Sequence, residues 1–126
     1  MIAHAAFVAP IAFALYRVGV DPKRLASDTG TLRLMVRATR QAFQALPACG
    51  NSQIPRHLRA LYLYAPERLA VAYWRRIMAS DSGELWFAGH TRAAPQEMTS
   101  LAAAVRDAVA RSRRPTPDLA ALLRLG

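Results

Sequence analysis

The sequence predicts an all-α domain, and three observations support this prediction. Apolar residues recur at helical spacing along several long segments. Prolines stand where the first turn of a helix is expected, as in Ala94-Pro95 and Thr116-Pro117. The alternation typical of a strand nowhere persists over about four residues between turn signals. We therefore expect a multi-helix bundle of about five to seven helices, a single domain over residues 1–126 without internal repeats.

The first expected helix covers residues 2–16 and is almost wholly apolar. No basic residue precedes it, it contains His4 and Pro10, and it is shorter than the ~20 residues that span a bilayer. A core helix surrounded by other helices is therefore favoured over a signal peptide or a membrane span.

An amphipathic helix is expected from Thr31 to Leu46, because its apolar and basic residues fall on opposite sides. The apolar side comprises Leu32, Met35, Val36, Phe43 and Leu46, and the other side Arg33, Arg37, Arg40 and Gln44. Pro47 ends this helix, and a shorter helix is expected from Pro55 to Tyr64.

A further helix is expected from Ala65-Pro66 to about Ser80. Its predicted apolar face consists of Leu69, Ala72, Tyr73 and Ile77. Asp81-Ser82-Gly83 has the composition of a turn. The aromatic segment at residues 85–88 fits either a helical turn or a brief extended piece.

The last strong segment begins at Pro95 and is expected to end near Ser112. Glu97 lies in its first turn, where a carboxylate meets the positive end of the helix. Its apolar stripe consists of Met98, Leu101, Val105 and Val109. Residues 113–115 break the chain, and Thr116 is expected to cap a short final helix that buries Leu119, Leu122 and Leu123.

The composition is that of a globular, strongly basic protein. The formal net charge is +9, which favours an acidic partner such as nucleic acid, anionic lipid or a phosphorylated ligand. The only cysteine, Cys49, excludes an internal disulfide and a cysteine-based zinc site, and it suits the reducing cytoplasm. Lys23 is the only lysine, so chemistry that needs a lysine has one candidate.

Familiar catalytic and cofactor motifs are absent from the sequence. His4, His57 and His90 have no second ligand at helical spacing, so no metal site is expected. No Gly-rich nucleotide loop and no serine elbow occurs. Glu84 and Glu97 could work as an acid–base pair, although solvated surface carboxylates are the favoured interpretation.

The arginines suggest a second hypothesis. Arg111, Arg113 and Arg114 cluster beside a helix C-terminus, where either complementing of the helix dipole or phosphate binding explains them. Aromatic and basic residues also alternate over residues 59–76, a pattern that suits stacking on bases. Half of those aromatics should face inward, which argues against nucleic-acid binding through this pattern. The alternative function is thus a free-standing basic helical module that binds nucleic acid or an acidic protein partner.

Both ends of the chain resemble the C-terminal domain of the ketopantoate reductase (2-dehydropantoate 2-reductase) family, within the 6-phosphogluconate dehydrogenase-like proteins. That family has a glutamate opening a long helix, a G-x-P-T-P type loop about twenty residues later and a final helix. Here Glu97 opens the helix and Arg114-Pro115-Thr116-Pro117 forms the loop. Residues 5–15, with Pro10, resemble the family's Lys-x-x-x-Asn-x-x-x-Asn-Pro helix. The resemblance covers essentially the whole of that domain.

The resemblance implies candidate site residues. Glu97 would be the catalytic glutamate, which hydrogen-bonds the substrate or helps to hold the catalytic lysine. Ser80 or Ser82 would correspond to the family's serine near the substrate.

The chain also departs from the family's pattern. The lysine position falls on Met1, and the two asparagine positions fall on Ala5 and Ala9. Only the glutamate of the family's site is therefore kept.

The function implied is that of the substrate-side and interface domain of an NADPH-dependent reductase of a small 2-oxo acid. In the family an N-terminal Rossmann domain carries NADP(H), and this sequence contains no such domain. We therefore expect no cofactor on this chain alone, no metal and no activity in isolation. A second copy of the chain or a Rossmann domain is the expected partner, covering an apolar patch at the first helix.

Overall fold

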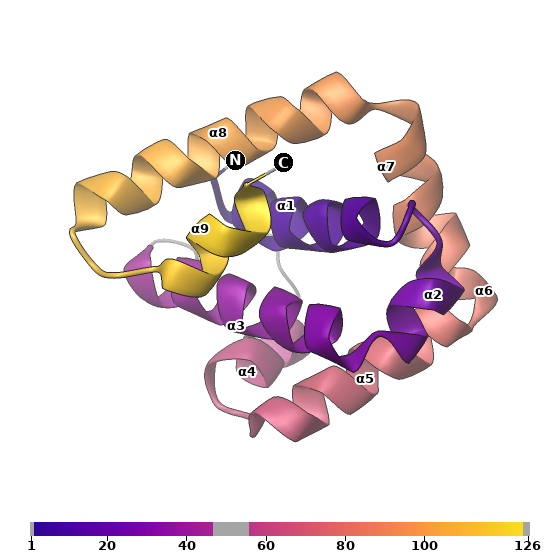
Figure 1. Cartoon of the computed structure of the whole chain (residues 1–126). Helices are drawn as coiled ribbons and strands as arrows, with labels where there is room; N and C mark the ends of the chain where they lie inside the picture. Colours follow the sequence, from indigo (N-terminus) through magenta and orange to yellow (C-terminus); the bar gives the residue numbers. More distant parts are fainter. Residues whose placement is uncertain (1, 47–55, 125–126) are drawn as a thin grey trace.

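The computed structural model describes residues 2–46 and 56–124, and within these ranges the chain is helical without any strand. The all-α prediction is thus confirmed. Figure 1 shows the helices arranged around a central one. Their bounds are α1 Ile2–Arg17, α2 Pro22–Ser27, α3 Thr29–Ala45, α4 Arg56–Leu63, α5 Glu67–Ala79, α6 Asp81–Gly83, the π-helix η2 Glu84–Ala88, α7 Gly89–Ala93, α8 Pro95–Ser112 and α9 Pro117–Leu123.

Helix α1 occupies the centre of the bundle. It packs against α8 on one side and against α3 and α9 on another (Figure 1). Its small residues are nearly inaccessible to solvent, so neighbouring helices approach it closely; these are Ala5, Ala6, Ala9, Ala12 and Ala14. The prediction of a core helix is therefore confirmed. Among the described helices, none combines the length and the apolar character that crossing a bilayer requires.

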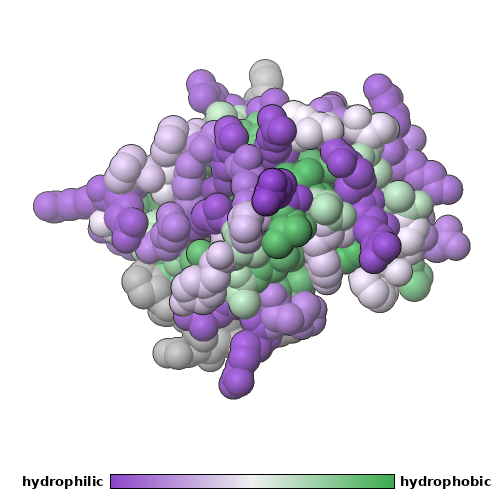
Figure 2. Space-filling view, turned by 90° about the horizontal axis from the view of Figure 1, so that it is seen from below, coloured by the Kyte–Doolittle hydropathy of each residue, from purple (hydrophilic) through white to green (hydrophobic). Residues whose placement is uncertain are grey.

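The expectation that α1 exposes an apolar patch is wrong for the residues whose burial the structure describes. From Ala5 to Tyr16, every residue of α1 is buried or half-buried, because α3, α8 and α9 cover it. The exposed large apolar side chains lie elsewhere, on or beside α4, α5 and η2; they are Tyr64, Leu69, Leu85 and Trp86. Figure 2 shows apolar residues gathered among hydrophilic ones on the face seen from below.

A cluster of aromatic rings joins α1, α4, α5 and η2. Trp74 is 1% exposed and stacks on Tyr62, with ring centroids 6.1 Å apart. Phe87 meets Trp74 edge to face at 5.5 Å, and Phe7 of α1 lies 6.1 Å from it. Tyr64, in contrast, is 75% exposed. The expectation that half of these aromatics face inward is thus confirmed.

Helices α3, α8 and α9 bury the apolar stripes that the sequence predicts. Leu32, Met35 and Val36 of α3 are fully buried, as are Met98 and Val105 of α8. The three leucines of α9 are at most 3% exposed. The predicted ends at Pro47 and Pro55 lie outside the described residues.

The predicted apolar face of α5 is wrong. Leu69 is 56% exposed and Ala72 is also exposed, whereas Tyr73 and Ile77 are half-buried. The buried side of α5 instead comprises Ala70, Val71, Trp74 and Met78. The helix is turned so that Trp74, its largest side chain, enters the aromatic cluster, because that placement buries the most apolar surface.

The turn expected at Asp81-Ser82-Gly83 is also wrong, because these residues form α6. The helix continues through η2 and α7, so residues 81–93 are helical throughout. Residues 85–88 accordingly belong to the π-helix, the helical one of the two conformations expected for them. Counting residues 81–93 as one segment, the described residues form eight helices, one more than the expected range.

Helix α2 is the additional one, and its N-terminal cap explains why it forms. The Asp21 carboxylate accepts hydrogen bonds from the backbone N–H groups of Lys23 and Arg24 at 3.0 and 3.4 Å. Pro22 occupies the first turn, where its missing N–H has no consequence. Asp28 caps the next helix, α3, by accepting from the N–H of Thr31 at 3.0 Å.

Long-range hydrogen bonds fasten the last helices to the first ones. The Tyr16 hydroxyl donates to the Thr91 carbonyl at 3.2 Å, and the Arg17 guanidinium donates to the Ala121 carbonyl at 2.8 Å. The Gln41 side chain of α3 both donates to the Asp118 carboxylate at 2.6 Å and accepts from the first N–H groups of α9. The Tyr16 bond holds α7 against α1, and the Arg17 and Gln41 bonds hold α9 against α1 and α3.

Candidate functional site

A pocket of about 240 Å³ lies between α2 and α6 and contains one of the predicted site residues, Ser80. It is half-open to solvent and mostly charged. Its lining residues are Asp21, Pro22, Lys23, Ser80, Asp81 and Glu84. A small polar molecule could fit in this volume.

Close packing at Gly83 brings the two helices of this pocket together. A Cβ atom at Gly83 would lie 2.9 Å from the Met78 Cα, 3.0 Å from the Pro22 Cβ and 3.1 Å from the Ile77 carbonyl oxygen. These distances are below van der Waals contact. A residue without a side chain is therefore needed for α6 to approach both α2 and α5, and this approach defines the pocket.

Ser80 and Ser82 are brought together, but as partners in a helix cap. The Ser80 hydroxyl donates to the Ile77 carbonyl at 2.7 Å and accepts from the Ser82 N–H at 3.3 Å. Its proton is thus committed to the backbone, which leaves only acceptor capacity toward a ligand. Ser82 does not line the pocket.

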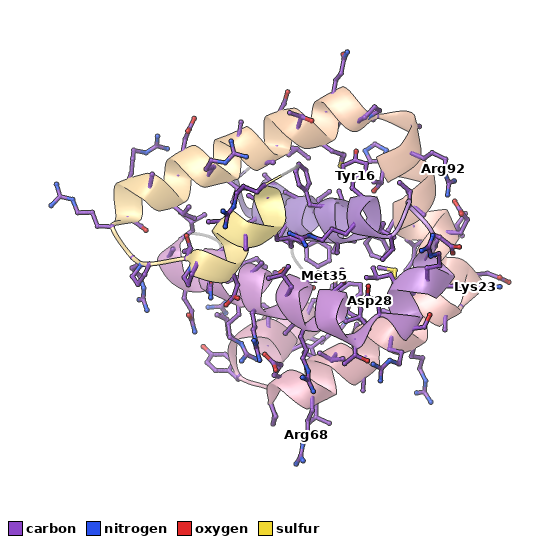
Figure 3. All side chains as sticks on the ribbon, in the orientation of Figure 1. Tyr16, Lys23, Asp28, Met35, Arg68 and Arg92 are labelled. Carbon is purple, nitrogen blue, oxygen red and sulfur yellow. The ribbon has the colours of Figure 1, made fainter. Side chains whose placement is uncertain are left out.

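Basic side chains stand at the edge of the pocket. Lys23 lines it, and Figure 3 shows Lys23 and Arg92 near the same end of the molecule. Arg92 forms an ion pair with Glu84 at 3.0 Å and also donates to the Val20 carbonyl at 2.8 Å. The hydrogen-bonded Glu84 carboxylate raises the pKa of Arg92 above its ordinary value, and the negative charge of Asp21 contributes in the same direction. Arg92 thereby ties α7 to the segment that precedes α2.

Glu97 does not line this pocket and lies at the start of α8. It is the third residue of the helix, as predicted, and its side chain is 57% exposed. Its carboxylate lies 3.7 Å from the Nε2 atom of His90 on α7. The two helices meet at Ala94, so this pair spans the corner between them.

The described contacts therefore join Ser80 to Ser82, but they join neither serine to Glu97. Glu84 and Glu97 have separate basic partners, Arg92 and His90. Each carboxylate thus has its own local role in the described contacts. Met1, where the family's lysine position falls, lies outside the described residues, and no cluster of three metal-ligating side chains occurs within them.

The sequence pattern does not predict the residues that complete the pocket. Lys23 is the only lysine of the chain, but its place beside Ser80 depends on α2, which the apolar periodicity does not predict. Asp21-Pro22 was the available signal, because an aspartate followed by proline is a typical helix start. Asp81 was assigned to a turn and instead opens α6.

Chemically, the pocket offers one ammonium group, a hydroxyl acceptor and three carboxylates. Such a mixture can orient a small polar molecule, with Lys23 as the group that would meet an anionic part of it. Glu97 offers an accessible carboxylate that could accept a hydrogen bond from a hydroxyl group. Comparison of the chain with protein-family models, with curated proteins and with solved structures finds no match.

Proposed function

We propose that the chain is the substrate-side and interface domain of a ketopantoate reductase-like oxidoreductase that reduces a small 2-oxo acid with NADPH. One observation supports this most directly: the separate segments that carry the resemblance pack against one another. These segments are α1, with Pro10, α8, which Glu97 helps to open, and the Thr116-Pro117 start of α9. Helix α1 packs against both α8 and α9 (Figure 1).

In this role Glu97 contacts the substrate. Its exposed carboxylate stands in the first turn of α8 and is held by a solvent-accessible pair with His90, which a ligand could replace at small cost. Ser80 contributes an acceptor oxygen in the α2–α6 pocket rather than a free hydroxyl proton.

The residues present do not fit NADP(H). The sequence has no Gly-rich phosphate loop. Ala5 and Ala9, at the family's asparagine positions, are at most 1% exposed and packed in the core. The cofactor therefore belongs to a separate nucleotide-binding domain. The present chain supplies the helical cover, the substrate glutamate Glu97 and an interface.

The test begins with the DNA upstream of the Met1 codon. We expect an in-frame segment that encodes a Gly-rich βαβ unit. The polypeptide that includes it should oxidise NADPH in the presence of ketopantoate or another small 2-oxo acid. Micromolar binding of NADPH to the present chain alone, measured by calorimetry, would contradict the proposal.

The role of Glu97 is tested in that longer polypeptide. We expect Glu97→Gln to lower kcat/KM at least about tenfold, equivalent to ~1.4 kcal/mol of transition-state stabilisation, with little change in Tm. His90→Gln removes the partner of Glu97 but keeps the carboxylate, so it should change kcat/KM less than about twofold. Equal losses in the two variants would assign Glu97 to its contact with His90 rather than to the substrate.

A further inference from the structure

A second pocket, of about 380 Å³, lies at the turn between α8 and α9. This turn is at the left of Figure 1, whereas helices α2 and α6 are at the right. The pocket combines basic and apolar walls; its lining residues are Arg106, Val109, Ala110, Arg113, Arg114, Pro115 and Thr116. The two pockets therefore share no residue.

The basic wall contains three arginines, and none of them forms an ion pair with a carboxylate of the described residues. Arg106 lies on α8, whereas Arg113 is the left-handed residue that ends this helix, and both line the pocket. Arg106 is held in place by donating to the Leu123 carbonyl at 3.4 Å. The N–H of Arg114 bonds to the Ser112 hydroxyl at 3.2 Å, which fixes the backbone of the turn.

The charge at this pocket is not cancelled by its surroundings. Guanidinium groups stay protonated at every physiological pH. The C-terminal end of α8 contributes only about half a negative charge, against three positive ones. Thr116 also lines the pocket. The expectation that its side chain caps α9 is wrong, because it accepts no cap hydrogen bond from that helix. Its hydroxyl group has a proton that can be donated to an anion. An anion with several acceptor oxygens matches this set of donors.

The rest of the lining is apolar. Val109 is only 6% exposed, and Ala110 and Pro115 add further apolar atoms. A free inorganic anion would leave this part of the pocket unused. A ligand with a compact apolar group next to its anionic group would contact both walls.

We propose that the α8–α9 pocket binds a small phosphorylated organic molecule, with its phosphate on the arginines and its organic part on Val109 and Pro115. This inference does not depend on the proposed reductase function, because it involves neither Glu97 nor the α2–α6 pocket. Arg111, which belongs to the same sequence cluster, does not line the pocket. Its position 140° around the helix from Arg106 accounts for this.

The test uses phenyl phosphate as the probe and calorimetry on the whole chain at low salt. Benzoate carries the same ring with a single negative charge, so it should bind at least about fivefold more weakly. The double variant Arg113→Gln/Arg114→Gln should weaken phenyl phosphate binding at least about tenfold. The matched control Arg111→Gln should change it less than about twofold. Circular dichroism establishes that each variant is folded, and Arg106→Gln replaces the double variant if that one unfolds.

Three results would overturn the proposal. Benzoate binding as tight as phenyl phosphate binding would show that the pocket does not select a phosphate. An equal loss in Arg111→Gln would show that the general positive field attracts the anion. A short DNA duplex that displaces phenyl phosphate, with affinity falling steeply with salt and depending equally on Arg111, would instead assign the charge to nucleic acid.

Discussion

Replacement of Gly83 by alanine tests the packing that forms the α2–α6 pocket. Gly83 is helical, so its backbone angles suit alanine, and helix propensity alone predicts a gain of about 1 kcal/mol. The added Cβ would, however, approach the Met78 Cα at 2.9 Å and the Ile77 carbonyl oxygen at 3.1 Å. Both are backbone atoms, so they cannot avoid the contact by changing a side-chain rotamer. Overpacking of this kind costs about 1–3 kcal/mol, and because the contacts are with backbone we expect a cost at the upper end of this range for Gly83→Ala.

The net expectation is a loss of about 2 kcal/mol in the free energy of unfolding. With an unfolding entropy of about 2.1 cal/mol/K per residue over 126 residues, each kcal/mol corresponds to about 4 °C, so Tm should fall by about 8 °C. Calorimetry or circular dichroism measures this directly. Gly30→Ala is the matched control, because its Cβ would meet only the Asp28 Oδ1 atom, at 3.7 Å, and Tm should stay level or rise by about 2–4 °C. A Gly83→Ala protein as stable as Gly30→Ala would refute the packing argument.

Further predictions concern a buried hydroxyl and a helix cap. The Tyr62 hydroxyl is buried without a hydrogen-bond partner among the described residues. Tyr62→Phe should therefore leave the free energy of unfolding, measured with urea at pH 7, unchanged or raise it by up to about 1 kcal/mol; a loss above ~1 kcal/mol would show that the hydroxyl is bonded. Burial raises the pKa of Tyr62 well above 10, whereas the unfolded chain ionises near 10. The wild type should therefore lose stability as pH rises above 10, and Tyr62→Phe should lose less between pH 8 and pH 11; parallel losses would contradict this linkage. Hydrogen bonding to Thr31 lowers the pKa of Asp28 below 3.8, so its stabilisation is present above pH 3.8 and is lost below it. In thermal melts at pH 7, Asp28→Ala should cost about 1 kcal/mol and Asp28→Asn much less, whereas equal losses would assign the effect to charge rather than to capping.

The sequence predicted helices well where one stripe of large apolar residues dominated. Leu32, Met35 and Val36 leave α3 with only one side that can face a core, and the leucines of α9 do the same. In α5, two adjacent stripes compete, one through Leu69 and Tyr73 and the other through Trp74 and Met78. The choice between them depends on Tyr62 and Phe87, which reach Trp74 from other helices. Periodicity within α5 carries no information about those neighbours.

The candidate sites show the same limit. The position of Glu97 in the first turn of α8 follows from Pro95, and local rules suffice to predict it. Its pairing with His90 depends on the angle between α7 and α8, which no spacing rule gives. Gly83 is the reason why a turn was expected at residues 81–83, because glycine is typical of turns. Here the glycine lies in a helix and its missing side chain allows close packing between helices. Tertiary packing thus determines both where the pocket lies and which residues line it.

The central position of α1 has a consequence for the order of events during synthesis. The helix that is richest in apolar residues is synthesised well before α8 and α9, which cover it and follow only after the 77 residues between Arg17 and Pro95 have been made. At about 5–20 residues per second, this interval lasts roughly 4–15 s. The bonds from Tyr16 to Thr91 and from Arg17 to Ala121 likewise join residues 75 and 104 positions apart. During that time only α3 of the three covering helices is present, so the nascent chain carries a partly uncovered hydrophobic helix, to which chaperones on the ribosome can bind.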